Sequence, residues 1–327
     1  MKDSVSKILI TGANGLLATN TIILLLEQDY QLVGLVRNRE KYVGEAHPRL
    51  TLIEGDITKY EDIEKAIIGC EYVLHIAAIT DQNLVDYEDY RKVNVIGTQH
   101  VLAAAVKHAV KRMVFVSSAN TFGYGSLESL GDEQQPIKEP FSNSFYSLSK
   151  LEAQDFLMAA ARENPHPEIV IVNPSFMLGA YDSKPSSGRI IQLFYRKKII
   201  FYPSGGKNFI HVKDAAQGLI NAITKGQHGE AYILAHENLS YRQFFQKLSA
   251  ISGKKYLLIP IPRAILWMAG YIGDVMRKLG IKTDLSSVNM KALMIKNFYS
   301  NQKTTKELGL SYQSVEQAIE DAVEWFE

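Results

Sequence analysis

The chain has a single cysteine, Cys70, among its 327 residues. No disulfide can form within it, and a zinc site built on cysteines is excluded. Charge of one sign is lacking too, because 36 basic and 35 acidic side chains leave a net charge of +1. The composition therefore gives no bulk positive field that would favour nucleic acid or an anionic membrane as a partner. One cysteine fits a reducing compartment, and we expect a cytoplasmic protein.

The sequence also lacks long apolar runs and a recognisable targeting segment. The short apolar stretch near the N-terminus ends at Thr11-Gly12-Ala13-Asn14-Gly15, not at a small-residue cleavage site. The most apolar late segment, residues 264–273, is too short for a membrane-spanning helix, which needs about 20 residues. We expect no membrane span and a buried helix here, with a helix lying on a membrane surface as the alternative. The eight histidines show no metal-ligand spacing, so we expect no metal.

Strand-like and helix-like runs alternate through the first half of the chain. Short apolar runs predict strands at residues 7–11, 31–36, 50–54, 72–77, 112–117 and 168–173. Apolar residues at helical spacing predict helices at residues 15–27, 60–68, 87–110 and 145–162. This order predicts an α/β fold of the Rossmann type, with helices on both faces of a doubly wound parallel sheet.

The rhythm changes after Pro174. Residues 179–188 are rich in Gly, Ser, Pro and Asp and predict a loop. The rest of this part predicts helices at 189–197 and 212–224, strands at 198–202 and 231–234, and capping-box helix starts at Ser240 and Ser314. We expect a smaller, mostly helical C-terminal lobe that binds substrate.

The expected domains follow from this change. Residues 1–173 form the dinucleotide-binding domain, and residues 203–234 return to it. Residues 174–202 and 235–327 form the substrate-binding lobe.

The first glycine turn lies between the first predicted strand and the first predicted helix. Gly12 can adopt backbone angles that side chains forbid, and Gly15 lets the backbone approach a pyrophosphate. The amide groups and the positive end of the helix attract phosphates. Ala18 stands at the third small position of the dinucleotide-binding fingerprint. An ordinary turn is the alternative, but the position in the first strand–turn–helix unit favours a dinucleotide.

The end of the second predicted strand indicates which dinucleotide is bound. An acidic residue there would bond the ribose 2′-hydroxyl of NAD, whereas this chain has Arg37. A guanidinium forms charge-assisted bonds to a 2′-phosphate, so we expect NADP(H) rather than NAD(H), with a solvated surface charge as the alternative. Asp56, after the third strand, is a candidate acceptor for the adenine amine, or simply a turn residue.

Tyr146 and Lys150 lie four residues apart and share one face of a predicted helix. The ammonium would favour the phenolate and lower the pKa of Tyr146, which could then pass a proton to a carbonyl oxygen. Ser118, at the end of a predicted strand, could hydrogen-bond the same oxygen. A second pair with this spacing, Tyr299 and Lys303, falls in a polar segment, and we expect it at the surface.

A series of short segments carries a family resemblance. In chain order they are Thr11-Gly12-Ala13-Asn14-Gly15, Gly55-Asp56, Ala77-Ala78, Asn94-Val95-Ile96-Gly97-Thr98, Ser117-Ser118-Ala119 and Tyr146-Ser147-Leu148-Ser149-Lys150. The sequence resembles the extended short-chain dehydrogenases/reductases over nearly its whole length. Residues 209–214 resemble the later Phe-(Ile/Val)-x-Val-x-Asp signature of that family.

The resemblance implies a catalytic set of Ser118, Tyr146 and Lys150, with Asn94 as a helper near the cofactor. The cofactor-binding residues that we expect are Thr11, Gly12, Asn14, Gly15, Leu16, Arg37, Asp56, Ile57, Ala77, Ala78, Asn94, Tyr146, Lys150, Asn173 and Ser175. A homodimer is implied by the resemblance alone.

Two segments favour the dihydroflavonol-4-reductase-like branch of the family, Val36-Arg37 and Val172-Asn173-Pro174-Ser175-Phe176. The nucleotide-sugar epimerases and dehydratases usually have an acidic residue after the second strand and an Arg-Asp pair before the late signature. This chain has Arg37 and Lys207-Asn208 there. Dehydratases also have an acidic pair after the catalytic serine, where this chain has Ala119-Asn120. Ala18 and Asn14 depart from the usual glycine-rich pattern.

We therefore expect an NADP(H)-dependent reductase that transfers hydride to a ketone or aldehyde, with Tyr146 as proton donor. The segments expected to line the substrate are residues 79–84, 175–178 and 179–189, and the apolar content of 190–202 and 256–271 suggests an apolar or aromatic substrate. A nucleotide-sugar epimerase or dehydratase with tightly bound NAD(P) is the alternative. A non-catalytic redox-sensing protein is a third possibility.

Three weaker candidates have simpler explanations. His75 lies in an apolar strand and is expected to be a core residue. His211 lies in the late signature, where a structural role and a substrate contact both stay open. The basic run at 196–198 is expected to be a solvated surface, with a substrate phosphate as the alternative.

Overall fold

A seven-stranded parallel sheet forms the centre of the computed structural model, which describes residues 5–327. Its strand order is β10-β6-β5-β4-β1-β2-β3. The strands are β1 (Lys7–Thr11), β2 (Gln31–Val36), β3 (Leu50–Glu54), β4 (Tyr72–His75), β5 (Arg112–Val116), β6 (Glu168–Pro174) and β10 (Glu230–Leu234). The sequence predicted all seven, and the Rossmann-type α/β fold is confirmed.

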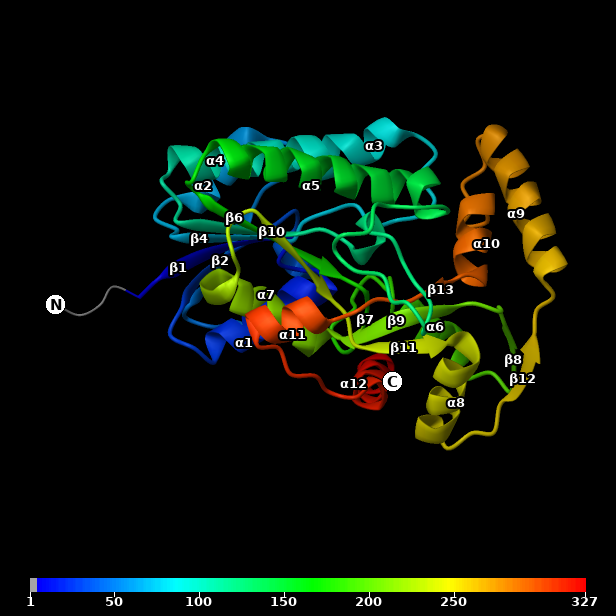
Figure 1. Ribbon diagram of the computed structural model, residues 1–327. Coiled ribbons are helices and arrows are strands. Elements are labelled where there is room, and N and C mark those ends of the chain that lie inside the picture. The colour runs from blue at the N-terminus through cyan, green and yellow to red at the C-terminus, as the bar shows by residue number, and fades with distance from the viewer. Residues whose placement is uncertain (1–4) are drawn as a thin grey trace.

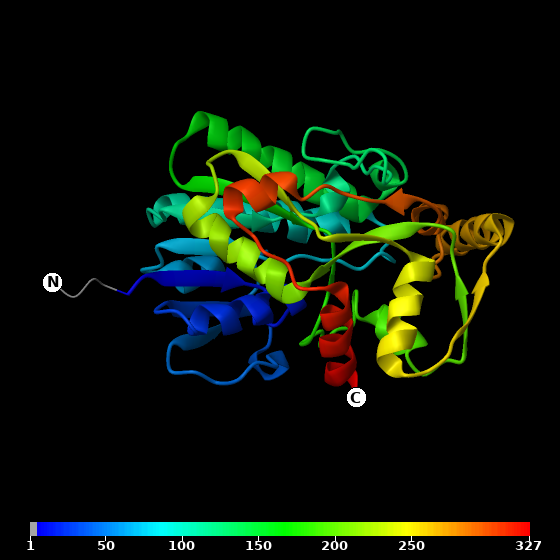
Figure 2. The same cartoon turned by 60° about the horizontal axis from the view of Figure 1, so that its bottom comes forward.

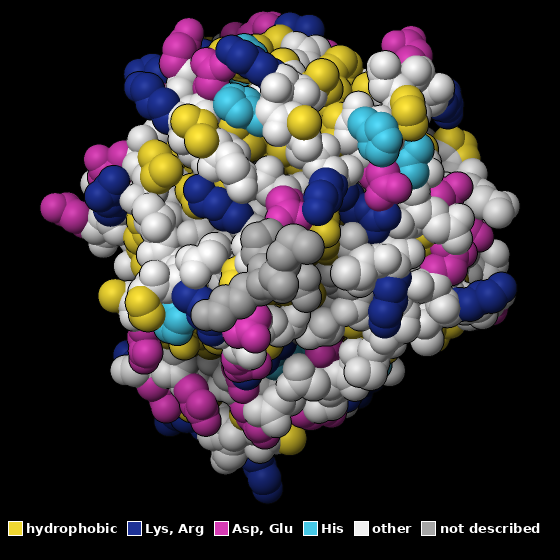
Figure 3. Space-filling view, turned by 90° about the vertical axis from the view of Figure 1, so that its left-hand side faces the viewer, with side chains coloured by type: hydrophobic (Ala, Val, Ile, Leu, Met, Phe, Trp, Pro, Cys, Tyr) yellow, Lys and Arg dark blue, Asp and Glu magenta, His cyan; other side chains and the backbone are white. Residues whose placement is uncertain are grey.

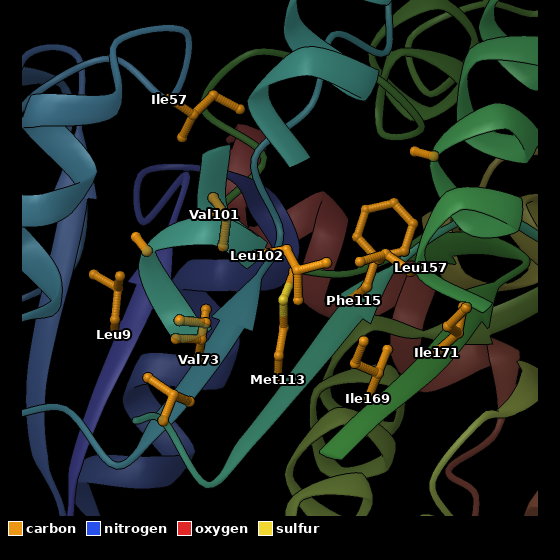
Figure 4. Packing of buried hydrophobic residues seen from close by; sticks show 14 of the residues in the cluster. Leu9, Ile57, Val73, Val101, Leu102, Met113, Phe115, Leu157, Ile169 and Ile171 are labelled. Atoms are coloured by element: carbon orange, nitrogen blue, oxygen red, sulfur yellow. The ribbon is translucent and has the colours of Figure 1, made fainter. Parts of the chain in front are cut away.

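Helices cover both faces of this sheet (Figure 1). One face is covered by α1 (Leu16–Leu26), α7 (Val212–Lys225) and α11 (Gln302–Leu308). The other is covered by α2 (Tyr60–Ile67), α4 (Gly97–Lys107) and α5 (Phe145–Glu163). Figure 4 shows the core on this second side, where Phe115 and Ile171 of the sheet meet Leu157 of α5. Since the strands are apolar on both sides, the sheet is stable only between these two helical layers.

The long helix expected at residues 87–110 is continuous but not uniform. It consists of α3 (Tyr87–Arg91), a π-helical segment (Lys92–Ile96) and α4. The wider π-helical turn contains the buried Asn94. Such turns often occur at functional sites, because they redirect a side chain without ending the helix.

The second part of the molecule contains more strand than the sequence pattern indicated. Strands β7 (Phe176–Leu178), β9 (Gly206–His211), β11 (Glu237–Ser240) and β13 (Lys296–Asn297) form a four-stranded sheet. Strands β8 (Ile199–Tyr202) and β12 (Leu257–Pro260) form a separate parallel pair. Its helices are α6 (Arg189–Phe194), α8 (Tyr241–Ser252), α9 (Arg263–Lys278), α10 (Ser287–Met294) and α12 (Val315–Phe326).

Both late helix starts are observed. Ser240 caps α8 in a full capping box with Gln243. Ser314 caps α12 by accepting from the Gln317 backbone N–H at 3.3 Å, but the Gln317 amide bonds Asp321 instead of returning to Ser314.

The prediction of a buried helix at residues 264–273 is wrong. Helix α9 lies at the end of the molecule farthest from the N-terminus (Figure 2). It packs mainly against α10 through Leu266, Gly270 and Gly273, and its other apolar side chains are exposed. Between residues 5 and 327, no helix is both long enough and apolar enough to cross a bilayer.

Candidate active site

The glycine turn between β1 and α1 is shaped for close backbone approach. Gly12 has a φ of +70°, and a Cβ added to it would lie 2.8 Å from the Cα of Ala77. Asn14, Gly15 and Leu16 complete the turn and begin α1, whose N-cap, Gly15, makes no side-chain cap. Among residues 5–327, no side chain caps the first N–H groups of α1, as in a site that binds phosphate.

Thr11 ties this turn to the end of β4. Its hydroxyl accepts hydrogen bonds from the backbone N–H groups of Ile76 and Ala77, each at 3.1 Å. Ala77 and the following Ala78 thus lie beside Gly12, where the sequence motifs predicted a cofactor surface.

His75 is a core residue. Its Nδ1 lies 2.8 Å from the Thr11 hydroxyl and its Nε2 lies 2.9 Å from the Thr98 hydroxyl. Thr98 in turn donates to the Asn94 carbonyl at 2.7 Å, which fits a neutral ring protonated at Nε2. Burial, together with a smaller effect of the Lys150 charge, lowers the pKa of His75 to about 3.

Asn94 fixes the loop that follows β4. Its side-chain oxygen accepts from the Ile79 N–H at 2.8 Å, and its amide donates to the Ile79 carbonyl at 3.1 Å. The amide also donates to the Ser149 hydroxyl on α5 at 2.9 Å. Asn94 therefore positions the protein groups around the predicted site.

Arg37 lies exposed at the end of β2, followed by Asn38 and Arg39. Asp56 lies on the next strand end and accepts from the Thr58 N–H at 2.9 Å, so it is at least a turn residue. Burial raises the pKa of Asp56, but the Thr58 hydrogen bonds and the Arg37 charge outweigh it and lower the pKa overall. Ile57 is buried and meets Gly97 of α4.

Ser118, Tyr146 and Lys150 come together at the end of β5. The Lys150 Nζ is buried and donates to the Val116 carbonyl at 2.6 Å, and it lies 4.4 Å from the centre of the Phe115 ring. Tyr146, one turn earlier on α5, is partly exposed, and a hydrogen bond with the Ser118 side chain acts to lower the pKa of its hydroxyl. Parallel sheets bind ligands at this carboxyl edge.

The structure gives a different electrostatic picture from the one expected for this pair. Burial raises the pKa of Tyr146, and the Ser118 hydrogen bond only partly opposes it. Burial also lowers the pKa of Lys150 to about 7. Lys150 is held by a backbone carbonyl, and burial disfavours its charged form, so the expected lowering of the Tyr146 pKa is not observed.

Asn173 lies beneath this site and is fully buried. Its amide donates to the Ser118 carbonyl at 3.1 Å and to the Gln154 side chain at 2.8 Å. Ser175, two residues later, instead donates to Asn208 on β9 at 2.7 Å. The structure therefore separates these two predicted cofactor residues, with Asn173 supporting the serine loop and Ser175 joining the two sheets.

Sequence reasoning missed Gln154. It lies on α5 four residues after Lys150 and eight after Tyr146, so the three share one face of the helix. The spacing of this glutamine could have predicted a polar helix face directed at the sheet, and Gln154 is indeed buried.

The prediction of a surface position for the second Tyr-x-x-x-Lys pair is wrong for the tyrosine. Tyr299 is buried in the main core, and its hydroxyl has no hydrogen-bond partner among the described residues. Lys303 bonds Glu230 at 2.6 Å and the Ala231 carbonyl at 2.8 Å. Because Tyr299 precedes α11, the pair does not share a helix face.

The late signature at residues 209–214 connects β9, α7 and the C-terminal segment through hydrogen bonds. His211 is buried and caps α7 by accepting from the Lys213 N–H at 3.0 Å. Asp214 accepts from the backbone and side chain of Gln313, at 2.8 and 3.0 Å, and so holds the C-terminal segment. The basic run at 196–198 is exposed, as expected.

The loop at residues 179–188 lies over the glycine turn. Asn20 of α1 donates to the Ala180 carbonyl at 3.0 Å, and Ser183 donates to the Asn14 carbonyl at 3.5 Å. The sequence predicted that this loop lines the substrate, whereas in the structure these hydrogen bonds hold it beside the predicted phosphate site. Within residues 5–327, no group of three or more His, Cys, Asp or Glu side chains could hold a metal ion.

Comparison with known proteins identifies the family. A family model described as the NAD dependent epimerase/dehydratase family matches residues 8–235. The chain belongs to this family. As an epimerase/dehydratase-family member, it is an NAD(P)-dependent oxidoreductase of the extended short-chain type, as the motifs predicted.

Two relatives and one solved structure of another protein match this chain over nearly its whole length. A protein of Synechocystis sp. named "Putative dihydroflavonol 4-reductase" is 32% identical over 97% of this chain and 94% of that protein. "Sterol demethylase protein B" of Methylococcus capsulatus is 25% identical over 97% of each. The crystal structure of gox2253 is 29% identical, has a TM-score of 0.84, and covers 99% of this chain and 98% of that one. The resemblance to the dihydroflavonol-4-reductase-like branch is thereby confirmed.

Proposed function

We propose that this protein is an NADP(H)-dependent reductase of a ketone or aldehyde. The observation that carries the proposal is the meeting of Ser118, Tyr146 and Lys150 at the sheet edge that also bears the glycine turn. NADPH, when bound, supplies a hydride to the carbonyl carbon. The Tyr146 hydroxyl would donate a proton to the carbonyl oxygen, and Ser118 would hydrogen-bond the same oxygen.

Lys150 would hold ribose hydroxyls of the cofactor with its Nζ. A cofactor hydroxyl beside this Nζ would partly replace the water that burial has removed, which favours the charged lysine. A charged Lys150 in turn stabilises Tyr146 as it loses its proton. Thr11, Gly12, Asn14, Gly15 and Leu16 would bind the pyrophosphate, with Asp56, Ile57, Ala77, Ala78 and Asn94 around the nucleoside parts.

The preference for NADP(H) rests on Arg37. No acidic residue stands in the three positions after β2, and Arg37 and Arg39 are both exposed there. Neither guanidinium forms an ion pair within residues 5–327: the Arg37 charge acts on Asp56 only at longer range, and Arg39 contacts Glu54 through its backbone N–H, at 2.9 Å. Each guanidinium is therefore available for a 2′-phosphate. Residues 1–173 with 203–234 would thus bind the cofactor, and residues 174–202 with 235–327 the substrate.

An observation at Lys207 favours a second candidate, a nucleotide-sugar epimerase or dehydratase. The Lys207 Nζ lies 4.9 Å from the centre of the Phe176 ring, and burial lowers the pKa of Lys207 to about 8. It has no acidic partner among the described residues, so a phosphate or carboxylate of a substrate would suit it. The reductase remains our proposal because Arg37 and the relative named for a reductase both favour it.

The test begins with titration of the purified protein with NADPH and NADH. We expect NADPH to bind at least tenfold more tightly, and Arg37→Ala to remove most of that difference while Lys41→Ala does not. Loss of absorbance at 340 nm with a ketone or aldehyde would support the reductase. Equal or tighter NAD binding, with no absorbance loss and a changed nucleotide sugar, would instead support the epimerase.

The role of Tyr146 has a matched control in this chain. We expect Tyr146→Phe to lower kcat by roughly 10²–10⁴-fold with cofactor binding retained, because only the transferable proton is lost. Tyr299→Phe removes the hydroxyl of the other Tyr-x-x-x-Lys pair and should leave kcat unchanged. A Tyr146→Phe enzyme with normal kcat would refute the proposed proton donor.

A further inference from the structure

The outer side of α9 is an exposed apolar surface that the proposed reaction does not use. Its exposed apolar residues include Met268 and Tyr271, whose side chains are 60% and 72% exposed. Together they form what we call the α9 face, made of Ile265, Trp267, Met268, Tyr271, Ile272 and Val275. Soluble proteins rarely leave so continuous an apolar surface uncovered unless it binds something.

The packing of α9 prevents it from turning this face inward. A Cβ on Gly270 would lie 2.9 Å from the Ser287 Cα, and one on Gly273 would lie 2.3 Å from the Leu285 carbonyl oxygen. Asp274 also accepts from the Ser287 N–H at 3.0 Å. These close contacts fix the rotation of α9, so the apolar side is directed outward by the fold itself.

Positive charge accompanies the α9 face. Residues 254–291 contain seven basic side chains and two acidic ones, a net charge of 7 − 2 = +5 in a chain whose total is +1. One of the two carboxylates, Asp284, is paired with Arg189 at 2.8 Å. Arg263, Lys278 and Lys282 have no acidic partner within residues 5–327. The α9 face itself contains no acidic side chain.

The neighbouring strand pair extends this surface. Ile199 and Phe201 of β8 and Leu257 of β12 are each at least half exposed, and β12 leads into α9. Figures 1 and 2 both show β8, β12 and α9 along the side of the molecule opposite the N-terminus. The N-terminal side has a different character, since acidic and basic groups alternate there and apolar groups are small and scattered (Figure 3).

We propose that the α9 face docks on the surface of an anionic lipid bilayer. An apolar helix side flanked by Lys and Arg lies in the membrane interface with its cations toward acidic headgroups. Trp267 and Tyr271 are the residue types that favour this interface. The helix has 16 residues, which suits lying in the interface rather than spanning it. A second copy would bring two surfaces of the same charge together, which opposes self-association.

Docking would bring the bilayer close to the proposed active site. Arg277 of α9 donates to the Gln82 carbonyl at 2.6 Å, in the loop that Asn94 fixes at Ile79. Lys291 of α10 lies 3.6 Å from Glu139, a few residues before Tyr146. We infer that an apolar substrate enters from the lipid phase, a step that rests on the proposed reductase, whereas the docking itself does not.

The experiment measures binding of the whole protein to vesicles by co-sedimentation. Vesicles are made of phosphatidylcholine alone or with 30% phosphatidylglycerol. We expect at least tenfold more protein on the anionic vesicles, with a strong decrease at high salt. The double variant Met268→Glu/Tyr271→Glu should lose at least tenfold, because acidic groups would replace apolar contact. Leu127→Glu, at a residue 61% exposed elsewhere, is the matched control and should bind normally.

A spectroscopic readout locates the contact. The chain has two tryptophans, so Trp325→Phe leaves Trp267 as the only one. Its emission should shift to shorter wavelength with anionic vesicles. Folded protein that stays in solution with no shift would refute the docking, as would a stable dimer in sedimentation equilibrium that the double variant dissociates. Vesicle binding by a protein that reduces no carbonyl compound would refute the proposed function alone.

Discussion

The ammonium of Lys150 is the clearest electrostatic feature at the scale of single residues. Burial lowers the pKa of Lys150 to about 7 from its ordinary 10.5. Between these two pH values the unfolded chain binds a proton that the folded chain does not, so stability should rise with pH across this window. Below about pH 7 both states are protonated and the dependence disappears.

This pH dependence can be isolated with a Lys150→Met variant. The free energy of unfolding of the wild type minus that of the variant should increase between pH 7.5 and 9.5, by at most about 1.4 kcal/mol per pH unit. Urea unfolding at several pH values measures both. A difference that stays constant with pH would mean that the folded protein keeps Lys150 charged.

Residue types alone could not predict which of the other titratable side chains are buried. His75 and Tyr299 both proved to be core residues, but only the histidine was expected there. The apolar neighbours of His75 in its own strand indicated burial, whereas the contacts that bury Tyr299 come from distant parts of the chain. Local sequence therefore predicts burial only where local neighbours cause it.

At the scale of elements, the β1–α1 turn makes a sharp prediction about glycine. Gly12 and Gly69 have nearly equal φ angles, +70° and +73°, but only Gly12 has backbone atoms close to where a Cβ would be. Alanine at Gly69 should cost about 1 kcal/mol for the left-handed backbone alone. Alanine at Gly12 should cost at least twice as much, because it would also overlap the Ala77 backbone.

Urea unfolding of Gly12→Ala and Gly69→Ala measures this difference. Titration with NADPH adds a second comparison, in which only Gly12→Ala should weaken binding. Equal losses of stability with normal cofactor binding in both variants would contradict the role of close approach at Gly12.

The strands of the C-terminal part explain where element prediction failed. Each of β7, β9, β11 and β13 has six residues or fewer and pairs with a strand distant in sequence. Strand β9 is central, since β7, β11 and β13 all pair with it. Apolar periodicity over so few residues has little signal, and the pairing depends on loop closure that local patterns do not encode.

At the scale of the whole molecule, we predict that the cofactor-binding and substrate-binding parts do not fold independently. Strand β10 pairs with β6, and α7 covers one face of the sheet with residues such as Leu219 and Ile223. We predict that residues 1–173 alone will not unfold cooperatively, because that face would be open to water. Circular dichroism during urea titration, compared with the intact chain, measures this. A cooperative transition in the fragment would contradict the prediction.

Whole-chain averages also concealed the distribution of charge. The net charge of +1 gave no reason to expect an anionic partner, yet residues 254–291 carry +5 and the remainder carries 1 − 5 = −4. The averaging hid an asymmetry that matters only because these residues lie together on one side of the fold.

The sequence by itself indicated the sheet, the glycine turn and the group of Ser118, Tyr146 and Lys150, because short local patterns mark the parts of each one. Alternating apolar runs suffice to specify a parallel sheet, and strand ends suffice to locate the polar residues that follow them. The tertiary structure decided which side chains are buried and which faces stay open. Tyr299 is buried and the α9 face is exposed for one physical reason, which is that burial depends on neighbours supplied from elsewhere in the chain.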